Sequence, residues 1–172
     1  MKKIILLGYM GCGKSTIALA LSNSIGIPFV DLDKEIEAKV GLSIDAIFKK
    51  HGEIYFRKLE HDVFIDLLNN SKELIIGLGG GTPCYANNHE LLKGANLVSI
   101  YLKASIDTLF HRLNHNKSKR PLLADKSEGE MKEFIAKHLF DRSFYYNQAQ
   151  YKVVVDDKTI KQTVLDIVAI LT

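Results

Sequence analysis

Short aliphatic runs alternate with longer amphipathic stretches along this chain. The runs are rich in β-branched residues and lack the polar alternation of half-exposed strands, which is typical of strands buried on both faces. They lie at residues 3–7, 28–31, 74–77, 97–102 and 152–155. The pattern therefore predicts five buried strands.

The stretches between the runs have helical spacing. Ile17, Leu21 and Ile25 recur every four residues, and Gly26 marks the expected end of that helix. Further helices are predicted at residues 53–70, after a cap at Ser105, and after residue 157. Strands that alternate with helices imply right-handed crossovers and a parallel sheet covered on both faces. The predicted fold is a three-layer α/β/α sandwich with a five-stranded parallel sheet.

Composition narrows the class of protein. The chain has 172 residues, 47% of them hydrophobic and 25% charged, and a net charge of +3. This mix is typical of a globular protein, and the absence of a run of like charges argues against a nucleic-acid partner. No apolar stretch approaches the roughly 20 residues of a membrane helix, so we expect no membrane partner.

No repeat, low-complexity segment or Pro/Gly/Ser-rich linker interrupts the sequence, so we expect one domain over residues 1–172. The only cysteines are Cys12 and Cys84. A disulfide between them would constrain a glycine-rich loop that must stay free to wrap a ligand. We therefore expect a reduced, cytoplasmic protein.

Residues 8–15 carry the first chemical signal. Their sequence, GYMGCGKS, satisfies the P-loop pattern GxxxxGK[ST] in full, directly after the first strand and at the start of the first helix. Glycines let successive N–H groups point at phosphates, and the helix N-terminus adds free donors and a positive dipole end. The segment therefore predicts a P-loop NTPase fold that binds a nucleoside triphosphate. The expected contacts are Gly11, Cys12, Gly13, Lys14, Ser15 and Thr16.

Within this loop, Lys14 is expected to neutralise the outer phosphates, and Ser15 to offer its hydroxyl to one Mg²⁺ per subunit. A glycine-rich turn that binds nothing is the alternative interpretation. Cys12 has two interpretations as well: a thiol activated by the helix N-terminus, or a small side chain that fills a tight loop.

Asp31 and Asp33 follow the second predicted strand. Ligands of open α/β sheets bind at the carboxyl ends of the strands, so both carboxylates are expected beside the P-loop. If the segment stays extended, Asp31 and Asp33 share one side and Leu32 faces away. One carboxylate could then serve the Mg²⁺ shell, for which Asp31 is the candidate, and the other could accept a hydroxyl proton. Alternatively, Asp33 is a helix cap.

The remaining candidate site residues are glycines and arginines. Gly79, Gly80 and Gly81 follow the third strand, where they allow close approach of a ligand to the backbone, although a generic turn is the alternative. Three arginines at positions 57, 120 and 142 suit an anionic substrate. Arg120 follows the polar, basic stretch 114–119, which indicates a lid at about residues 113–127 that closes over the phosphates.

Together these residues resemble the shikimate kinases, within the nucleoside-monophosphate-kinase-like P-loop proteins. The motifs of that family occur here in order: the P-loop at 8–15, Asp-x-Asp at 31–33, Gly-Glu-x-x-Phe-Arg-x-x-Glu at 52–60, Gly-Gly-Gly at 79–81, Arg-Pro-Leu-Leu at 120–123 and Arg-x-x-x-Tyr at 142–146. One departure is Phe144, where the family usually has proline, so the chain path after Arg142 is expected to differ from that of the family.

The resemblance implies ATP-dependent phosphorylation of the 3-hydroxyl of shikimate, in the route to chorismate and the aromatic amino acids, by a monomer. The implied catalytic residues are Lys14, Asp33 and Arg120. Asp33 would hold the shikimate hydroxyls, and it either takes the proton or mainly orients the acceptor. The substrate-binding segment is about 33–60. Substrate contacts would come from Asp33, Arg57, Gly79, Gly80, Gly81 and Arg142, and further ATP contacts from Arg120 and Arg112, the latter stacking on adenine.

Other P-loop proteins remain as alternatives. A gluconate kinase or a nucleoside monophosphate kinase shares the P-loop but does not call for the acidic pair, three glycines and paired arginines together. A P-loop GTPase switch needs a guanine-binding Asn-Lys-x-Asp. The nearest run, residues 116–119, ends in Lys119 and so carries the wrong charge.

Overall fold

A parallel sheet in the strand order β2-β3-β1-β4-β5 forms the centre of the computed structural model, which describes residues 2–115 and 122–172. The strands of this sheet are β1 (Lys3–Leu7), β2 (Phe29–Asp31), β3 (Leu74–Gly77), β4 (Leu97–Lys103) and β5 (Tyr151–Val154). They match the five predicted runs to within one residue at each end. The predicted five-stranded parallel sheet is confirmed.

β1 is the central strand, and all five of its residues are buried. It pairs with β3 from Lys3 opposite Leu74 and with β4 from Lys3 opposite Leu97. Burial on both faces explains why its sequence is uniformly aliphatic after Lys3.

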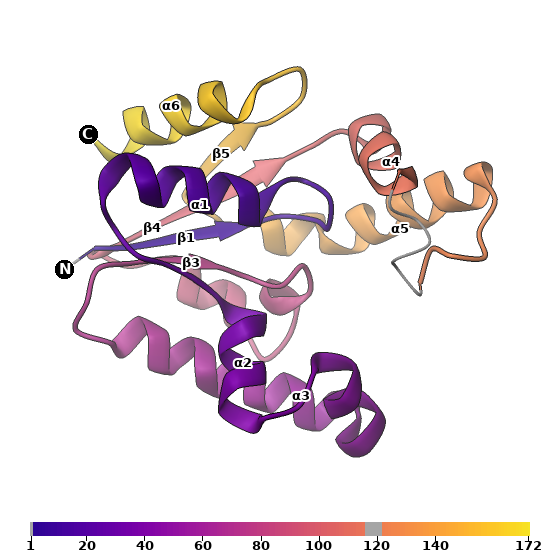
Figure 1. Cartoon of the computed structure of the whole chain (residues 1–172), viewed down its shortest axis with the longest axis horizontal. Helices are drawn as coiled ribbons and strands as arrows, with labels where there is room; N and C mark the ends of the chain where they lie inside the picture. Colours follow the sequence, from indigo (N-terminus) through magenta and orange to yellow (C-terminus); the bar gives the residue numbers. More distant parts are fainter. Residues whose placement is uncertain (1, 116–121) are drawn as a thin grey trace.

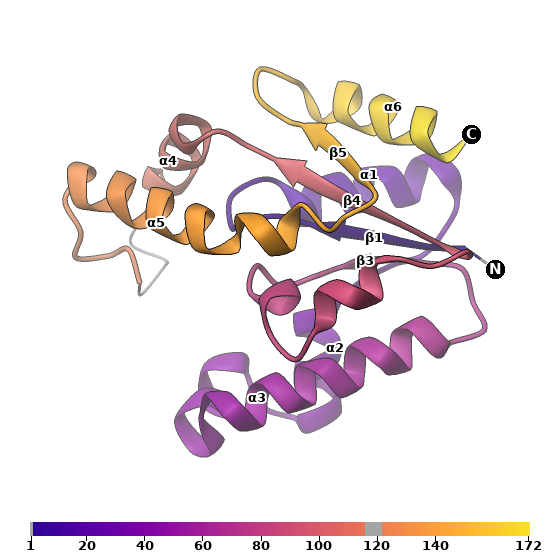
Figure 2. The same cartoon turned by 180° about the vertical axis from the view of Figure 1, so that it is seen from behind.

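Helices cover both faces of the sheet (Figures 1 and 2). α1 (Lys14–Ile25) and α6 (Ile160–Leu171) pack together on one face. In the view from behind, α5 (Glu128–Tyr146) crosses the other face. α4 (Ile106–Asn114) packs on α5, and α2 (Leu32–Val40) packs on α3 (Ile44–Asn69). Two short 3₁₀ helices, η1 (Thr82–Cys84) and η2 (Asn88–Leu92), follow β3. The three-layer α/β/α architecture predicted from the sequence is therefore confirmed.

Local chemistry sets the helix ends. Gly26 closes α1 in a left-handed conformation with φ 72°, as predicted. The Ser105 side chain caps α4 by accepting from the amide of Thr108, also as predicted. Ser127 and Thr159 form capping boxes at the starts of α5 and α6.

α3 differs from its prediction at the N-terminal end. It begins at Ile44, where Ser43 caps it, and not at residue 53. Gly52 interrupts it with φ 80° and ψ 176°, a conformation essentially restricted to glycine. The predicted helix therefore corresponds to the segment after this kink.

The carboxyl ends of the strands meet at one edge of the sheet. The P-loop follows β1, α2 follows β2, the three glycines follow β3, and the loop to α6 follows β5. This is the edge at which ligands of open α/β sheets bind. Within the described ranges, no helix is long and apolar enough to cross a membrane.

Candidate active site

The P-loop adopts a conformation that depends on glycine. Gly11 and Gly13 have φ of 83° and 97°, in the left-handed region that side chains disfavour. Gly13 is also the N-cap of α1, so the free N–H groups of that helix face the loop. The loop thus has the geometry of an anion-binding cradle.

Lys14 lies folded over this cradle. Its Nζ donates to the carbonyl of Gly8 at 2.7 Å, so the charge is held at the mouth of the loop. Cys12 is buried and free, and a methyl group added at Gly8 would lie 2.9 Å from its Sγ. This contact favours the loop-filling interpretation of Cys12.

Ser15 and Asp31 bring two oxygens together beside the loop. The Ser15 hydroxyl donates to Oδ2 of Asp31 over 3.5 Å. Hydroxyl and carboxylate oxygens are the ligand type that Mg²⁺ takes, and Mg²⁺ is usually held by few protein groups. The pair therefore fits a Mg²⁺ site.

The extended segment expected from Asp31 to Asp33 was wrong. Asp31 is the N-cap of α2, where its Oδ1 accepts from the amides of Asp33 and Lys34 at 3.0 and 3.3 Å. Leu32 already starts the helix and is fully buried. The capping role weighed for Asp33 thus belongs to Asp31. Both carboxylates nevertheless line one groove, because Asp33 lies in the first turn of α2.

Asp33 has an unusual electrostatic environment. Burial, followed by the nearby carboxylates of Asp31 and Glu60, raises its pKa to about 6. Lys14 opposes this shift. A carboxyl with a pKa near 6 is ionised at neutral pH and retains appreciable basicity, which suits proton transfer.

Three glycines after β3 make room for the side chains around them. A methyl group added at Gly79 would lie 3.1 Å from Oδ1 of Asp33. The same addition at Gly80 would lie 3.2 Å from Nη1 of Arg142, and at Gly81 2.9 Å from Nη2 of Arg57. The run therefore brings the backbone close to the side chains of Asp33, Arg142 and Arg57.

Arg57 on α3 is held by a network that also includes Thr82 of η1. Its Nη1 donates to Oε1 of Glu60 at 2.9 Å, and Oε2 of Glu60 accepts from the Thr82 hydroxyl at 2.8 Å. The guanidinium carbon lies 3.8 Å from the centre of the Tyr85 ring. Charge-assisted bonds and stacking together restrict the guanidinium to one orientation.

Arg142 reaches the same glycines from α5. Its guanidinium carbon lies 5.6 Å from the centre of the Tyr9 ring. Tyr146, one turn further along α5, donates from its hydroxyl to the carbonyl of Gly80 at 2.7 Å. α5 continues as a helix through the exposed Phe144, so the departure from the family at this position leaves Arg142 in the site.

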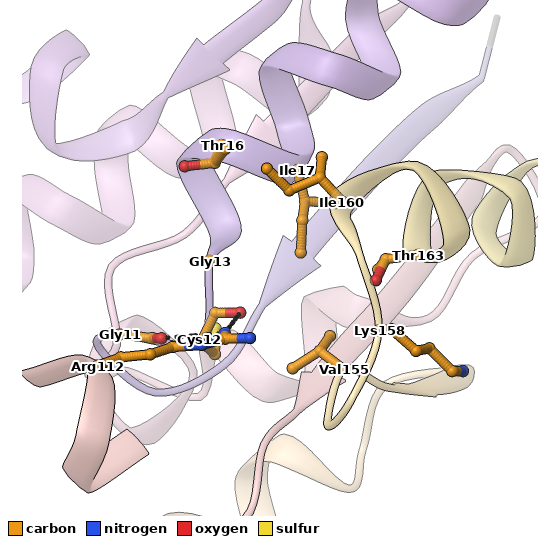
Figure 3. Close-up of a pocket in the computed structure, with 10 residues that line it drawn as sticks. All are labelled: Gly11, Cys12, Gly13, Thr16, Ile17, Arg112, Val155, Lys158, Ile160 and Thr163. Carbon is orange, nitrogen blue, oxygen red and sulfur yellow. Dashed lines mark hydrogen bonds between the residues drawn. The ribbon is translucent and has the colours of Figure 1, made fainter. Parts of the chain in front are cut away.

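A second cavity, of about 320 Å³, opens on the far side of the P-loop. Figure 3 shows Arg112 beside Gly11 and Cys12, with Val155, Ile160 and Ile17 across the cavity. Nη1 of Arg112 donates to the carbonyl of Cys12 at 3.1 Å. The full lining is Gly11, Cys12, Gly13, Thr16, Ile17, Arg112, Val155, Lys158, Ile160 and Thr163.

The sequence did not identify which residues after β5 line this cavity; they are Val155, Lys158, Ile160 and Thr163. The available signal was positional, because β5 ends at the same sheet edge as the P-loop. The mix of an apolar wall with an arginine suits a planar heterocycle. The cavity shares Gly11, Gly13, Thr16 and Arg112 with the groove that contains Lys14, Ser15, Asp31 and Asp33.

Arg120 and most of the polar stretch before it lie outside the described residues. The predicted roles of Arg120 and of a lid at 113–127 therefore stay predictions.

The P-loop lies between a cavity suited to a heterocycle and a groove lined by Asp31 and Asp33, with Arg57 and Arg142 close to the glycines after β3. This arrangement is that of a P-loop kinase. The shikimate kinase family model matches residues 10–172. The chain is 69% identical to a shikimate kinase of Flavobacterium johnsoniae, with 99% of each protein covered. It therefore belongs to the shikimate kinase family.

Solved structures agree with this assignment. A shikimate kinase from Bacteroides thetaiotaomicron superposes with a TM-score of 0.90 at 33% identity, covering 99% of this chain and 98% of the other. A shikimate kinase from Acinetobacter baumannii, solved in complex with shikimate, superposes with a TM-score of 0.86 at 31% identity, covering 99% and 93%.

Proposed function

We propose that this chain transfers the terminal phosphoryl group of ATP to the 3-hydroxyl of shikimate, giving shikimate 3-phosphate for chorismate and aromatic amino acid synthesis. The observation that carries the proposal is the convergence of Asp33, Arg57 and Arg142 on Gly79–Gly81, beside the P-loop. Membership of the family supports the choice of substrate.

The donor binds along the P-loop. Its phosphates accept from the loop amides and from Lys14, while adenine occupies the cavity between Arg112 and Val155. Ser15 and Asp31 would hold Mg²⁺, which, when bound, neutralises charge on the outer phosphates. Because phosphoryl transfer passes through a loose transition state, positioning and charge neutralisation are the main tasks of the protein.

The acceptor binds over the three glycines. Arg57 and Arg142 bind the shikimate carboxylate from opposite sides, since a planar guanidinium can pair two nitrogens with two carboxylate oxygens. Asp33 accepts a hydrogen bond from the 3-hydroxyl and takes its proton as the new P–O bond forms. The raised pKa of Asp33, about 6, makes it a better base than an ordinary aspartate.

We also propose that the enzyme acts as a cytoplasmic monomer. Asp33, Arg57 and Arg142 lie close to Gly79–Gly81 within one copy of the chain, which is consistent with a monomer. Light scattering of the purified protein tests the monomer, and a dimer that alone is active would overturn it.

A coupled assay for ADP release tests the function. The purified chain with Mg²⁺ and ATP should release ADP with shikimate and give only background with gluconate, AMP or no acceptor. The product should be shikimate 3-phosphate by mass spectrometry and ³¹P NMR. Turnover of gluconate or AMP together with inactivity toward shikimate would overturn the assignment.

A further inference from the structure

Tyr9 connects two parts of the site that lie far apart in the sequence. It is the second residue of the P-loop segment and is almost fully buried, with 1% of its surface exposed. Its hydroxyl lies 3.0 Å from Nδ1 of His138, which is on α5. The rings of Tyr9 and His138 meet edge to face with their centres 5.9 Å apart. A buried hydroxyl loses free energy if it is unpaired, so this contact is a specific link between the P-loop and α5.

The helix that carries His138 also carries Arg142. Positions four apart lie on the same face of a helix, so His138 and Arg142 both face the P-loop. Arg142 lies over the same Tyr9 ring, 5.6 Å from its centre, and close to Gly80. One tyrosine therefore contacts both side chains, through its hydroxyl and through its ring.

His138 is suited to a fixed, neutral role. Its ring packs on Phe134 with the centres 4.2 Å apart. Burial, and then the charge of Arg142, lower the pKa of His138, while Asp141 opposes the shift. A neutral imidazole can accept the Tyr9 hydroxyl hydrogen at Nδ1.

We propose that Tyr9 and His138 are positioning residues that fix Arg142 against the P-loop, and so hold the acceptor carboxylate at a set distance from the phosphates. The inference rests on the proposed function, in which Arg142 binds that carboxylate. Neither residue touches the reacting groups in this proposal. Their effect is transmitted through the Tyr9 ring, whose orientation the hydrogen bond to His138 determines.

The first test is steady-state kinetics of Tyr9→Phe and His138→Ala. Each removes the hydrogen bond, and we expect each to raise the KM for shikimate about three- to tenfold, the range that one net hydrogen bond allows. The kcat and the KM for ATP should change by less than about twofold, because the donor contacts and Asp33 remain. Tyr151→Phe and His111→Ala are matched controls: Tyr151 is exposed on the edge strand β5, and His111 is exposed on α4.

A double variant and a rescue variant distinguish a positioning role from a general loss of structure. The double variant Tyr9→Phe/His138→Ala should raise the KM for shikimate no further than either single change. His138→Asn should restore a near-normal KM, because its amide can occupy the place of Nδ1, and it should lose this advantage over His138→Ala when Tyr9 is Phe. Circular dichroism and melting curves establish that each variant is folded.

An unchanged KM for shikimate in both folded single variants would overturn the proposal, as would multiplicative effects in the double variant. If wild-type protein phosphorylates shikimate while the variants match it, only the positioning role fails. If the wild type has no shikimate-dependent activity, the proposed function itself fails. Calorimetric titration of shikimate into the wild type and Tyr9→Phe then decides the positioning role independently of turnover: an equal Kd overturns it, and a weaker Kd in the variant supports it.

Discussion

Arg57 pairs with a carboxylate that is almost completely buried: Glu60, with 1% of its side chain exposed, accepts from Nη1 of Arg57 at 2.9 Å. Arg57 itself is 17% exposed. The Thr82 hydroxyl satisfies the other oxygen of Glu60 at 2.8 Å. Glu60 therefore holds Nη1 of the guanidinium, Glu53 accepts from Nε at 3.4 Å, and the guanidinium keeps further N–H donors for an incoming carboxylate.

Replacing Glu60 should harm both folding and acceptor binding. Glu60→Gln keeps the shape but removes the charge that compensates a largely buried arginine. We expect a loss of roughly 1–3 kcal/mol in the free energy of unfolding and a rise of about tenfold in the KM for shikimate. Glu53→Gln is the matched control, because Glu53 contacts the same arginine at 3.4 Å but is 54% exposed. Equal effects of the two substitutions in urea denaturation and kinetics would contradict this account.

Arg57→Lys should show that geometry, and not charge alone, binds the acceptor. An ammonium cannot form the planar, paired contact of a guanidinium with a carboxylate, nor stack on Tyr85 in the same way. We expect the KM for shikimate to rise by about 10- to 100-fold while the KM for ATP stays close to wild type. A KM for shikimate that is unchanged in this variant removes Arg57 from the carboxylate site.

Local sequence signals predicted the fold because they act over a few positions. The P-loop pattern, the aliphatic runs and the Ser105 cap each depend on neighbouring residues, and each was confirmed. The 31–33 segment failed because alternation assumes a strand, whereas the Asp31 side chain starts a helix by accepting two amides. Short polar side chains favour caps for this reason.

Long-range pairs could not be predicted in the same way. Tyr9 and His138 are 129 positions apart, and the wall formed by Val155 and Ile160 meets the P-loop only after the sheet has formed. For the wall, the sequence gives only the position of the residues after the last strand, and it gives no signal that pairs Tyr9 with His138. Strand order, which brings β5 to the same edge as β1, is the physical feature that creates them.

Gly81→Ala tests the close approach of Arg57 to the backbone. The added methyl group would lie 2.9 Å from Nη2 and 3.1 Å from Nη1, so the guanidinium must move. We expect the KM for shikimate to rise at least about fivefold, because displaced hydrogen bonds lose about 1 kcal/mol or more. Gly129→Ala is the control: nothing lies within 4 Å of its added methyl group, and alanine in a helix should leave kinetics unchanged and stability equal or higher. Wild-type kinetics for Gly81→Ala would mean that Arg57 has more freedom than this contact implies.

Arg112→Ala should separate the donor site from the acceptor site. It removes the donor to the Cys12 carbonyl and one wall of the heterocycle cavity. We expect the KM for ATP to rise about 5- to 50-fold, with the KM for shikimate nearly unchanged. Lys158→Ala is a useful comparison in the same cavity, because the Lys158 ammonium is paired with Asp166 at 2.7 Å and should matter less. A larger rise in the KM for shikimate than in the KM for ATP would assign Arg112 to the acceptor site and contradict this account.

Protonation of Asp33 should set the decrease of activity at acid pH. Because its pKa is raised to about 6, Asp33 becomes protonated as the pH falls through that value and can no longer accept the hydroxyl proton. We expect kcat/KM for shikimate to fall about tenfold for each pH unit below about 6, and Asp33→Asn to lose at least about 100-fold in kcat at pH 8 with no such decrease in its residual activity. A wild-type profile that is flat between pH 5 and 7 would contradict this assignment.

The raised pKa of Asp33 also predicts that stability changes with pH in the direction opposite to activity. The folded state holds the Asp33 proton up to about pH 6, whereas the unfolded chain releases it near 3.8. Stability therefore decreases as the pH rises from about 4 to 6, and the full cost, roughly 1–3 kcal/mol, is present above pH 6.

Asp33→Asn removes this cost, so without Mg²⁺ it should melt at a higher temperature than wild type at pH 8, and the difference should shrink toward pH 4. Asp62→Asn, on the exposed side of α3, is the control and should shift the melting temperature little. A lower melting temperature for Asp33→Asn at pH 8 would show that its ionised carboxylate stabilises the fold, contrary to the burial and like-charge contacts around it.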